Sequence, residues 1–132
     1  MKRLGLALLG AGRMGQVHAE CLGGIAEARV VAVADPVREQ AERAAFLARA
    51  ERVFLDPLEA MEAPGVEGVV IVTPTPTHAP LIREAARRKK AIFCEKPVAL
   101  DLPSTQEALE EVRTQGVPFQ IGFQRRFDPG YA

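Results

Sequence analysis

The first candidate functional motif in the sequence is a glycine-rich hexapeptide at positions 10–15, which has the spacing G-x-G-x-x-G. Gly10 permits a tight turn after a strand, Gly12 lets a pyrophosphate approach the backbone, and Gly15 lets the following helix pack close to the strand. The backbone N–H groups of Arg13 and Met14 would face the phosphates, because a helix N-terminus favours negative charge. The motif stands between a strand-like and a helix-like run, so it predicts a dinucleotide-binding loop.

A carboxylate follows at the expected distance. Asp35 ends the second predicted strand, twenty residues after Gly15. A carboxylate there accepts hydrogen bonds from the adenosine ribose and repels a 2′-phosphate, which favours NAD over NADP. Arg38 is a nearby cation that would weaken this preference. Because Asp35 precedes Pro36, it is also a good helix N-cap, and the two roles are compatible.

Two further motifs follow later strands. Residues 73–78, Thr-Pro-Thr-Pro-Thr-His, come after an apolar run at 68–72. In one interpretation, His78 borders the predicted ligand crevice and has a functional role. In the alternative, the segment is only a turn that starts the next helix: Thr75 or Thr77 caps that helix, and His78 is exposed to solvent.

The second of these motifs is Glu95-Lys96-Pro97, which follows a strand at 91–94. Lys96 would project into the same crevice and could hydrogen-bond a substrate hydroxyl, with burial and a neighbouring nicotinamide charge lowering its pKa. The alternative is a surface ion pair that ends the strand before a proline. We also predict a cis Lys96–Pro97 peptide bond. Cys94 is expected to be a core residue rather than a nucleophile.

The elements that must position these residues alternate between strand and helix. Strands are predicted at 3–9, 29–34, 53–54, 68–72, 91–94 and 117–121. Helices are predicted at 13–23 and 37–50, and a short third helix begins at 57. A fourth helix follows the loop at 73–80 and ends at about 90, and a fifth runs from a Ser104–Glu107 capping box to 115. Asp56 and Pro57 are expected to be the N-cap and first residue of the short third helix. Six strands with helical crossovers predict an α/β fold: a doubly wound parallel sheet of the Rossmann type, in the order 3-2-1-4-5-6.

Composition excludes several classes of function. The 132 residues contain 17 basic and 17 acidic side chains, so no net field exists to hold nucleic acid or an anionic membrane. Cys21 and Cys94 have neither metal-ligand spacing nor the number needed for a disulfide framework, which predicts no metal site and a reducing, cytoplasmic setting. A signal peptide at residues 1–9 is the alternative for the first apolar run, but the run is short, Gly5 interrupts it, and no Ala-x-Ala site follows.

The end of the chain is unusually aromatic. Four of its seven aromatic residues are Phe119, Phe123, Phe127 and Tyr131. Such side chains need an apolar partner surface. We therefore expect this tail to contact a further domain, a partner chain or a second copy of the protein.

In this order, the motifs resemble the Gfo/Idh/MocA oxidoreductase family, most closely its inositol 2-dehydrogenase-like members. The matching stretches are Gly10-Ala11-Gly12-Arg13-Met14-Gly15-x-x-His18, Ala34-Asp35-Pro36, Thr73-Pro74-x-x-x-His78, Cys94-Glu95-Lys96-Pro97 and Gly122-Phe123-Gln124-Arg125-Arg126-Phe127-Asp128. The resemblance implies NAD(P)-dependent hydride transfer between nicotinamide and a secondary alcohol of a polyol or sugar. It also implies a dinucleotide-binding domain at 1–121 and, at 122–132, the start of a connection to a second α/β domain that this chain lacks.

The resemblance also assigns roles to residues. Lys96 becomes the catalytic lysine, which binds the reacting hydroxyl and assists its proton loss, and Arg126 a substrate contact. The implied cofactor-binding set is Gly10, Gly12, Arg13, Met14, Asp35, Thr73, Pro74, Thr75, His78, Glu95 and Lys96. The second domain would supply an Asp and a His beside the substrate, so the chain alone is expected to bind NAD weakly and turn over little or nothing.

Two other functions remain open. One is a non-enzymatic NAD(H)-binding or interaction module. The other is a different two-domain Rossmann reductase, of the dihydrodipicolinate or homoserine type; Glu95-Lys96-Pro97 and the Gln-Arg-Arg-Phe-Asp stretch argue against it.

Overall fold

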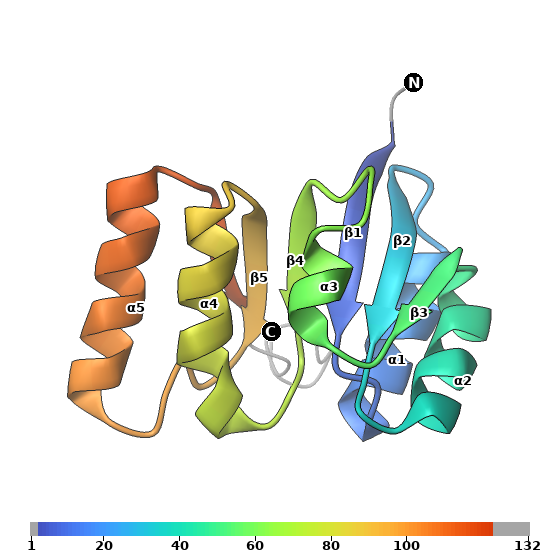
Figure 1. Cartoon of the computed structure of the whole chain (residues 1–132), viewed down its shortest axis with the longest axis horizontal. Helices are drawn as coiled ribbons and strands as arrows, with labels where there is room; N and C mark the ends of the chain where they lie inside the picture. Colours follow the sequence, from blue (N-terminus) through green and yellow to red (C-terminus); the bar gives the residue numbers. More distant parts are fainter. Residues whose placement is uncertain (1–2, 123–132) are drawn as a thin grey trace, which may run out of the picture.

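Six parallel strands form one sheet in the order β3-β2-β1-β4-β5-β6 (Figure 1). The computed structural model describes residues 3–122. The strands are β1 (Leu4–Leu9), β2 (Ala28–Ala34), β3 (Arg52–Phe54), β4 (Gly68–Ile71), β5 (Ala91–Glu95) and β6 (Phe119–Gly122). The fold class and the strand order predicted from the glycine-rich motif are both confirmed.

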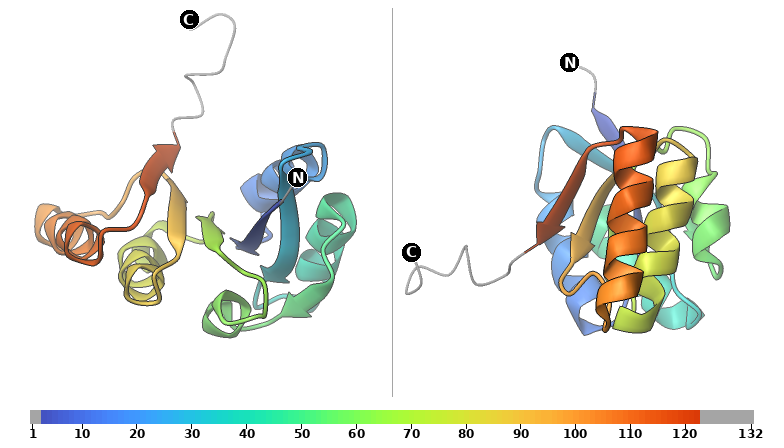
Figure 2. Two further views of the ribbon diagram at one scale, coloured as in Figure 1. Left: turned by 90° about the horizontal axis from the view of Figure 1, so that it is seen from above. Right: turned by 90° about the vertical axis from the view of Figure 1, so that its left-hand side faces the viewer.

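Helices cover both faces of the sheet. They are α1 (Arg13–Gly23), α2 (Arg38–Ala48), α3 (Pro57–Met61), α4 (His78–Arg87) and α5 (Leu102–Gln115), with a short 3₁₀ helix η1 (Thr75–Thr77) before α4. Figure 2 shows α1 and α2 on one face and α3, α4 and α5 on the other. Within residues 3–122, no helix has both the length and the apolar character needed to cross a membrane.

The core consists of two apolar layers, one on each face. Ala7 and Leu9 of β1 belong to the layer under α3, α4 and α5, whereas Leu6 and Leu8 belong to the layer under α1 and α2. The alternation follows from the pleat of a strand, which points successive side chains to opposite faces. Because both faces are covered, β1 and β2 are apolar at nearly every position instead of at every second one.

The strands end in register at one edge. Ala34, Leu9, Ile71, Cys94 and Ile121 are paired in one row across β2, β1, β4, β5 and β6. The segments that follow these strands therefore emerge side by side. At a strand spacing of about 4.8 Å, the end of β5 lies about 10 Å from the end of β1.

The predicted N-cap of α3 is confirmed, whereas the predicted N-cap of α5 is wrong. Asp56 is the N-cap of α3 and accepts a hydrogen bond from the Leu58 N–H at 2.9 Å, as predicted. For α5 the predicted Ser104–Glu107 capping box is wrong, because the helix starts three residues earlier with Asp101 as its N-cap. Asp101 accepts hydrogen bonds from both the N–H and the hydroxyl of Ser104, at 2.7 and 3.0 Å.

The start of α4 also differs from the prediction. Thr77 occupies the N-cap position of α4, as the alternative had it, but its side chain makes no capping hydrogen bond. Its hydroxyl donates to the Pro74 carbonyl at 2.6 Å and is also hydrogen-bonded to the Thr73 hydroxyl at 2.5 Å. The Thr75 side chain forms no cap either. The Thr77 hydroxyl turns back into the loop because η1 places the Pro74 carbonyl within its reach.

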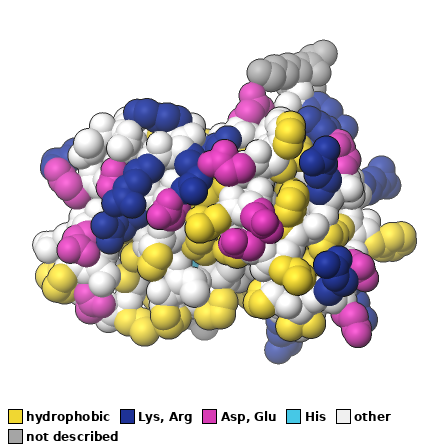
Figure 3. All heavy atoms as spheres, viewed as in Figure 1, with side chains coloured by type: hydrophobic (Ala, Val, Ile, Leu, Met, Phe, Trp, Pro, Cys, Tyr) yellow, Lys and Arg dark blue, Asp and Glu magenta, His cyan; other side chains and the backbone are white. Residues whose placement is uncertain are grey.

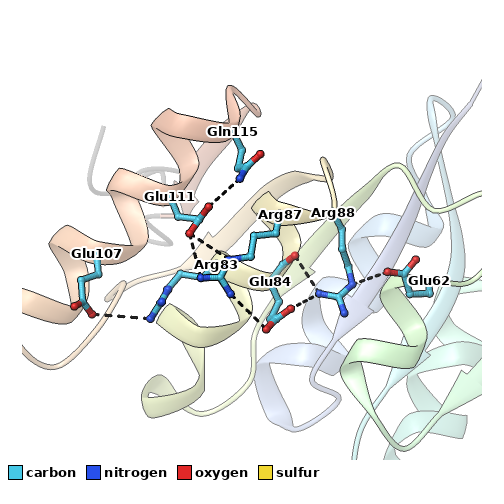
Figure 4. Close-up of polar contacts among 8 residues, drawn as sticks. All are labelled: Glu62, Arg83, Glu84, Arg87, Arg88, Glu107, Glu111 and Gln115. Atoms are coloured by element: carbon cyan, nitrogen blue, oxygen red, sulfur yellow. Dashed lines mark hydrogen bonds and ion pairs between the residues drawn. The ribbon is translucent and has the colours of Figure 1, made fainter.

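Ion pairs bridge the outer helices (Figure 4). Arg88, at the C-cap of α4, contacts Glu62 after α3 at 2.5 Å and also pairs with Glu84, while Arg87 contacts Glu111 of α5 at 3.2 Å. The Gln115 side chain donates to Glu111 and lowers the pKa of that carboxyl. Figure 3 shows Lys and Arg interspersed with Asp and Glu over α4 and α5. Exposed pairs of this kind each contribute little to stability.

Candidate functional site

The glycine-rich loop joins β1 to α1 and requires glycine at two of its positions. Gly10 has φ +103°, and a Cβ there would lie 2.7 Å from the Val72 carbonyl. A Cβ on Gly15 would lie 2.2 Å from the Gly10 oxygen, so α1 packs as close to the loop as predicted. At Gly12, by contrast, no described atom comes within 4 Å of a Cβ. The space above Gly12, at the N-cap of α1, is open for a ligand.

Asp35 ties the end of β2 to this loop. One carboxylate oxygen accepts a hydrogen bond from the Ala11 N–H at 3.0 Å, and the other accepts one from the Val37 N–H at 2.9 Å. The prediction that Asp35 is the helix N-cap is wrong, because α2 begins at Arg38 with Val37 as its N-cap. Each carboxylate oxygen has lone-pair capacity beyond these bonds. Asp35 is 8 % exposed, at the edge where β1 and β2 end.

A cavity of about 390 Å³ opens beside the loop on the Asp35 side. Its lining includes Gly12, Arg13, Gln16, Glu39, Gln40 and Arg43. The Gln16 amide nitrogen donates to the Ala11 and Gln40 carbonyls, at 2.8 and 3.0 Å. The Gln16 Oε1 atom is buried without a hydrogen-bond partner in the described part of the chain. An acceptor left open beside an open glycine suits a ligand that carries a donor.

Sequence reasoning missed two residues of this cavity. Gln16 follows Gly15 directly, so its position in the first turns of α1 was the available signal. Arg43 lies well inside α2, and only the packing of α2 against α1 brings it to the loop. Arg38, the cation expected near Asp35, is not part of the lining.

His78 lies at the other end of the site, at the start of α4. It is 2 % exposed, so the alternative that it is exposed to solvent is wrong. Its Nε2 atom lies 2.7 Å from the Thr73 carbonyl oxygen, and its Nδ1 atom lies 2.8 Å from the Pro97 carbonyl oxygen. His78 therefore connects the loop after β4 to the loop after β5.

The Glu95-Lys96-Pro97 motif begins at the last residue of β5. Glu95 contacts the imidazole of His18 at 2.7 Å, and the two side chains are 15 % and 21 % exposed. The His18 ring also lies edge-on to Phe93, with 5.7 Å between the ring centroids. Lys96 is exposed at the strand end. The Lys96–Pro97 peptide bond is cis, as predicted.

Cys94 is a core residue, as predicted. It is fully buried, and burial together with the charge of Glu95 raises the pKa of its thiol to about 12. A thiol of this kind is not a nucleophile near neutral pH. Within residues 3–122, no cluster of three His, Cys, Asp or Glu side chains is arranged to hold a metal ion.

Arg126, the predicted substrate contact, lies outside the described residues, as do three of the four tail aromatics, Phe123, Phe127 and Tyr131. The remaining predicted residues converge on one edge. Arg13 and Met14 begin α1 above the glycine loop, and Thr73, Pro74 and Thr75 follow β4 next to it.

The fold and this edge define a dinucleotide-binding Rossmann domain. Residues 4–123 match the model of the oxidoreductase family described as having an NAD-binding Rossmann fold. The chain therefore belongs to the Gfo/Idh/MocA oxidoreductase family, and these residues correspond to its NAD-binding domain.

Individual relatives agree with this assignment. The chain is 46 % identical over 127 residues to scyllo-inositol 2-dehydrogenase (NAD(+)) of Bacillus subtilis, covering 96 % of this chain and 37 % of that protein. It is 48 % identical over 124 residues to inositol 2-dehydrogenase of Rhizobium meliloti, covering 94 % and 37 %. The chain thus spans well under half the length of these relatives.

A solved structure superimposes closely. The scyllo-inositol dehydrogenase of Lactobacillus casei, solved with bound NAD(H) and scyllo-inositol, gives a TM-score of 0.91 at 30 % identity. The match covers 98 % of this chain and 39 % of that one.

Proposed function

We propose that this chain is the cofactor-binding part of an NAD-dependent dehydrogenase that acts on a secondary alcohol of a polyol or sugar, with an inositol as the leading substrate class. The observation that carries the proposal is the convergence of the open Gly12 loop, the Asp35 carboxylate and Lys96 on one sheet edge. The names of the relatives support the substrate class.

The cofactor-binding roles follow from this arrangement. Gly10, Gly12, Arg13 and Met14 place the start of α1 at the pyrophosphate, where the helix dipole favours an anion. Asp35 accepts hydrogen bonds from the ribose hydroxyls and repels a 2′-phosphate, so NAD is preferred to NADP. Arg13 and Arg43 line the cavity beside it and soften this preference.

The nicotinamide end lies on the other side of the loop. Thr73, Pro74 and Thr75 border it after β4, and Glu95 and Lys96 border it after β5. The buried His78 supports the loop after β4, because its ring is hydrogen-bonded to the Thr73 carbonyl. When bound, oxidised nicotinamide supplies the acceptor for the hydride. We propose residues 1–121 as this cofactor domain and 122–132 as the start of the connection to the rest of a longer protein.

Lys96 is the proposed catalytic residue. Its ammonium group donates a hydrogen bond to the reacting hydroxyl and stabilises the negative charge that develops as the proton leaves. Arg126 is proposed as a second substrate contact. The relatives are more than twice as long as this chain, and we propose that the general base and the rest of the substrate pocket come from the corresponding part of such a protein. A missing base typically costs about 10²- to 10⁴-fold in rate, so the 132-residue chain alone should turn over little.

The experiment is calorimetric titration of the chain with NADH and NADPH. We expect NADH to bind more tightly, and Asp35→Asn to narrow the difference, because the amide keeps acceptor capacity but removes the charge. Asp56→Asn is the matched control, since Asp56 also binds a backbone N–H near a helix start but lies at α3. The absence of NADH binding at millimolar concentration would contradict the proposal.

One observation favours a second function, an interaction module. An apolar groove of about 440 Å³ lies over β1, β4, β5 and β6 beside α1, and its lining includes Leu6, Leu22, Val70, Phe93 and Phe119. In Figure 2, α4 and α5 lie on the opposite face of these strands. The aromatic tail, a partner chain or a second copy would bind in this groove. Light scattering that finds only monomers at all concentrations would argue against self-association.

A cytoplasmic setting remains part of the proposal. Cys21 is an exposed free thiol and Cys94 a buried one, as is typical of proteins in a reducing compartment.

A further inference from the structure

Both histidines of the chain contact residues next to Lys96. The sequence contains two histidines, His18 and His78. His18 belongs to α1 and contacts the Glu95 carboxylate, directly before Lys96. His78 belongs to α4 and contacts the Pro97 carbonyl, directly after Lys96. Because α1 and α4 cover opposite faces of the sheet (Figure 2), the two histidines reach the neighbours of Lys96 from opposite faces.

The chemistry at His78 is specific. Its two ring nitrogens lie 2.7 and 2.8 Å from two carbonyl oxygens, those of Thr73 and Pro97. A carbonyl oxygen only accepts hydrogen bonds, and a neutral imidazole has a single N–H. Both contacts are hydrogen bonds at the same time only when His78 is the imidazolium, which donates from both nitrogens. In that form one buried ring joins the loop after β4 to the loop after β5.

His18 contacts the residue on the other side of Lys96. Its Nε2 atom lies 2.7 Å from the Glu95 carboxylate, and its ring packs edge-on against Phe93 of the same strand. These two contacts fix the imidazole over the last residues of β5. Glu95 is only 15 % exposed, so the contact is shielded from water better than a surface pair.

We propose that His18 and His78 are positioning residues for Lys96: His18 fixes the residue before it, and His78 fixes the residue after it and links it to the Thr73 loop. Lys96 itself is exposed and has a long side chain, so the placement of its backbone sets where the ammonium group can reach. Neither histidine needs to contact substrate. The inference rests on the proposed function in one respect, since Lys96 is taken to be the catalytic residue.

The first test replaces each histidine by a residue that keeps one of its contacts. Gln extends its amide to about the place of Nε2, and Asn to about the place of Nδ1. His18→Gln should keep the Glu95 contact and His18→Ala should lose it. His78→Asn should keep the Pro97 contact, and His78→Gln should keep the Thr73 contact.

The readout is amide hydrogen exchange in the segments 73–75 and 95–98, at every residue except Pro74 and Pro97, which have no N–H. Losing one hydrogen bond of this kind should speed local exchange by about 10-fold. We expect His18→Ala to speed exchange at 95–98 and His18→Gln to restore the wild-type rate. His78→Asn should speed exchange at 73–75 and not at 95–98, and His78→Gln should do the opposite. Equal exchange in all variants, or no rescue by the conservative ones, would overturn the proposal.

A second measurement uses the wild-type chain and so does not depend on any variant folding. Nitrogen NMR of the His78 ring should find both ring nitrogens in hydrogen bonds. A ring nitrogen without a hydrogen bond would overturn the link between the two loops. The proposed function is tested separately by NADH titration of the wild type. Failure to bind NADH would leave the exchange pattern intact, whereas failure of the positioning role would alter that pattern with NADH binding retained.

Discussion

The open space above Gly12 leads to a sharp prediction for Gly12→Ala. Apart from its chain neighbours, no described atom lies within 4 Å of the added methyl group, and the backbone at this position is extended, with φ −73° and ψ −155°. Alanine is a poorer N-cap than glycine, which costs about 0.5–1 kcal/mol, but it lowers the entropy of the unfolded chain, which contributes about 0.4–1 kcal/mol in the other direction. The free energy of unfolding should therefore change by less than about 1 kcal/mol.

Cofactor binding should respond very differently. The methyl group would occupy the space through which a pyrophosphate reaches the backbone N–H groups at the start of α1. Losing one hydrogen bond to a charged group costs about 1.5–3 kcal/mol, which corresponds to a roughly 10- to 100-fold weaker NADH affinity. Calorimetric titration measures this affinity, and thermal unfolding of the same samples checks the stability.

The matched control is Gly24→Ala at the other end of α1. Gly24 has φ −98°, and the nearest described atom to an added Cβ is the Cys21 oxygen at 3.6 Å. This variant should retain wild-type affinity for NADH. An unchanged affinity in Gly12→Ala would refute the placement of the pyrophosphate. An equal loss in both variants would show instead that α1 as a whole had been perturbed.

Three further predictions concern stability and reactivity. Gly10→Ala should lower the free energy of unfolding by about 2–4 kcal/mol, because φ is +103° and the Cβ would overlap the backbone after β4; a loss below about 1 kcal/mol in urea titration would contradict this. Asp101→Ala should lower the free energy of unfolding by about 1 kcal/mol in the same assay, and Ser104→Ala should lower it clearly less, because Asp101 is the N-cap of α5. A larger loss in Ser104→Ala than in Asp101→Ala would favour the Ser104 capping box instead. The pKa of Cys94 is raised from its ordinary value of 9.0 to about 12, so its contribution to stability is present below about pH 9 and is lost as the pH rises toward 12. Cys94→Ala should flatten that loss in thermal unfolding followed from pH 8 to 11, and identical pH profiles for the variant and the wild type would count against it.

The sheet could be predicted because its signals are local. Each strand is a short apolar run, and the spacing of Gly10, Gly12 and Gly15 specifies the strand–loop–helix unit from which the strand order follows. The cap at Asp56 was predictable because its partner is two residues away. The start of α5 was not, because Asp101 with Pro103 and Ser104 with Glu107 are both valid start signals three residues apart, and the sequence does not show which one prevails.

The site was predictable in its positions but not in its contacts. Lys96, Thr73 and Asp35 follow strands, so their common edge could be inferred from the topology. The partners of the histidines could not be inferred in this way. His18 contacts Glu95 77 residues further along the chain, and His78 bridges carbonyls 5 and 19 residues away. A histidine after a loop is equally compatible with exposure and with burial, and only the packing of α4 decides between them.

The contact between Asp35 and the Ala11 N–H bears on how the cofactor preference of this domain could be redesigned. Replacing the carboxylate to admit a 2′-phosphate would also remove the acceptor that holds the glycine loop against β2. Leucine or alanine at position 35 would leave a buried N–H without a partner. Asparagine removes the charge and keeps one oxygen for the Ala11 N–H, but its amide nitrogen cannot accept the hydrogen bond that the Val37 N–H now makes. Cofactor choice and loop anchoring therefore depend on one side chain, and a redesign of the first has to supply a new acceptor for the second.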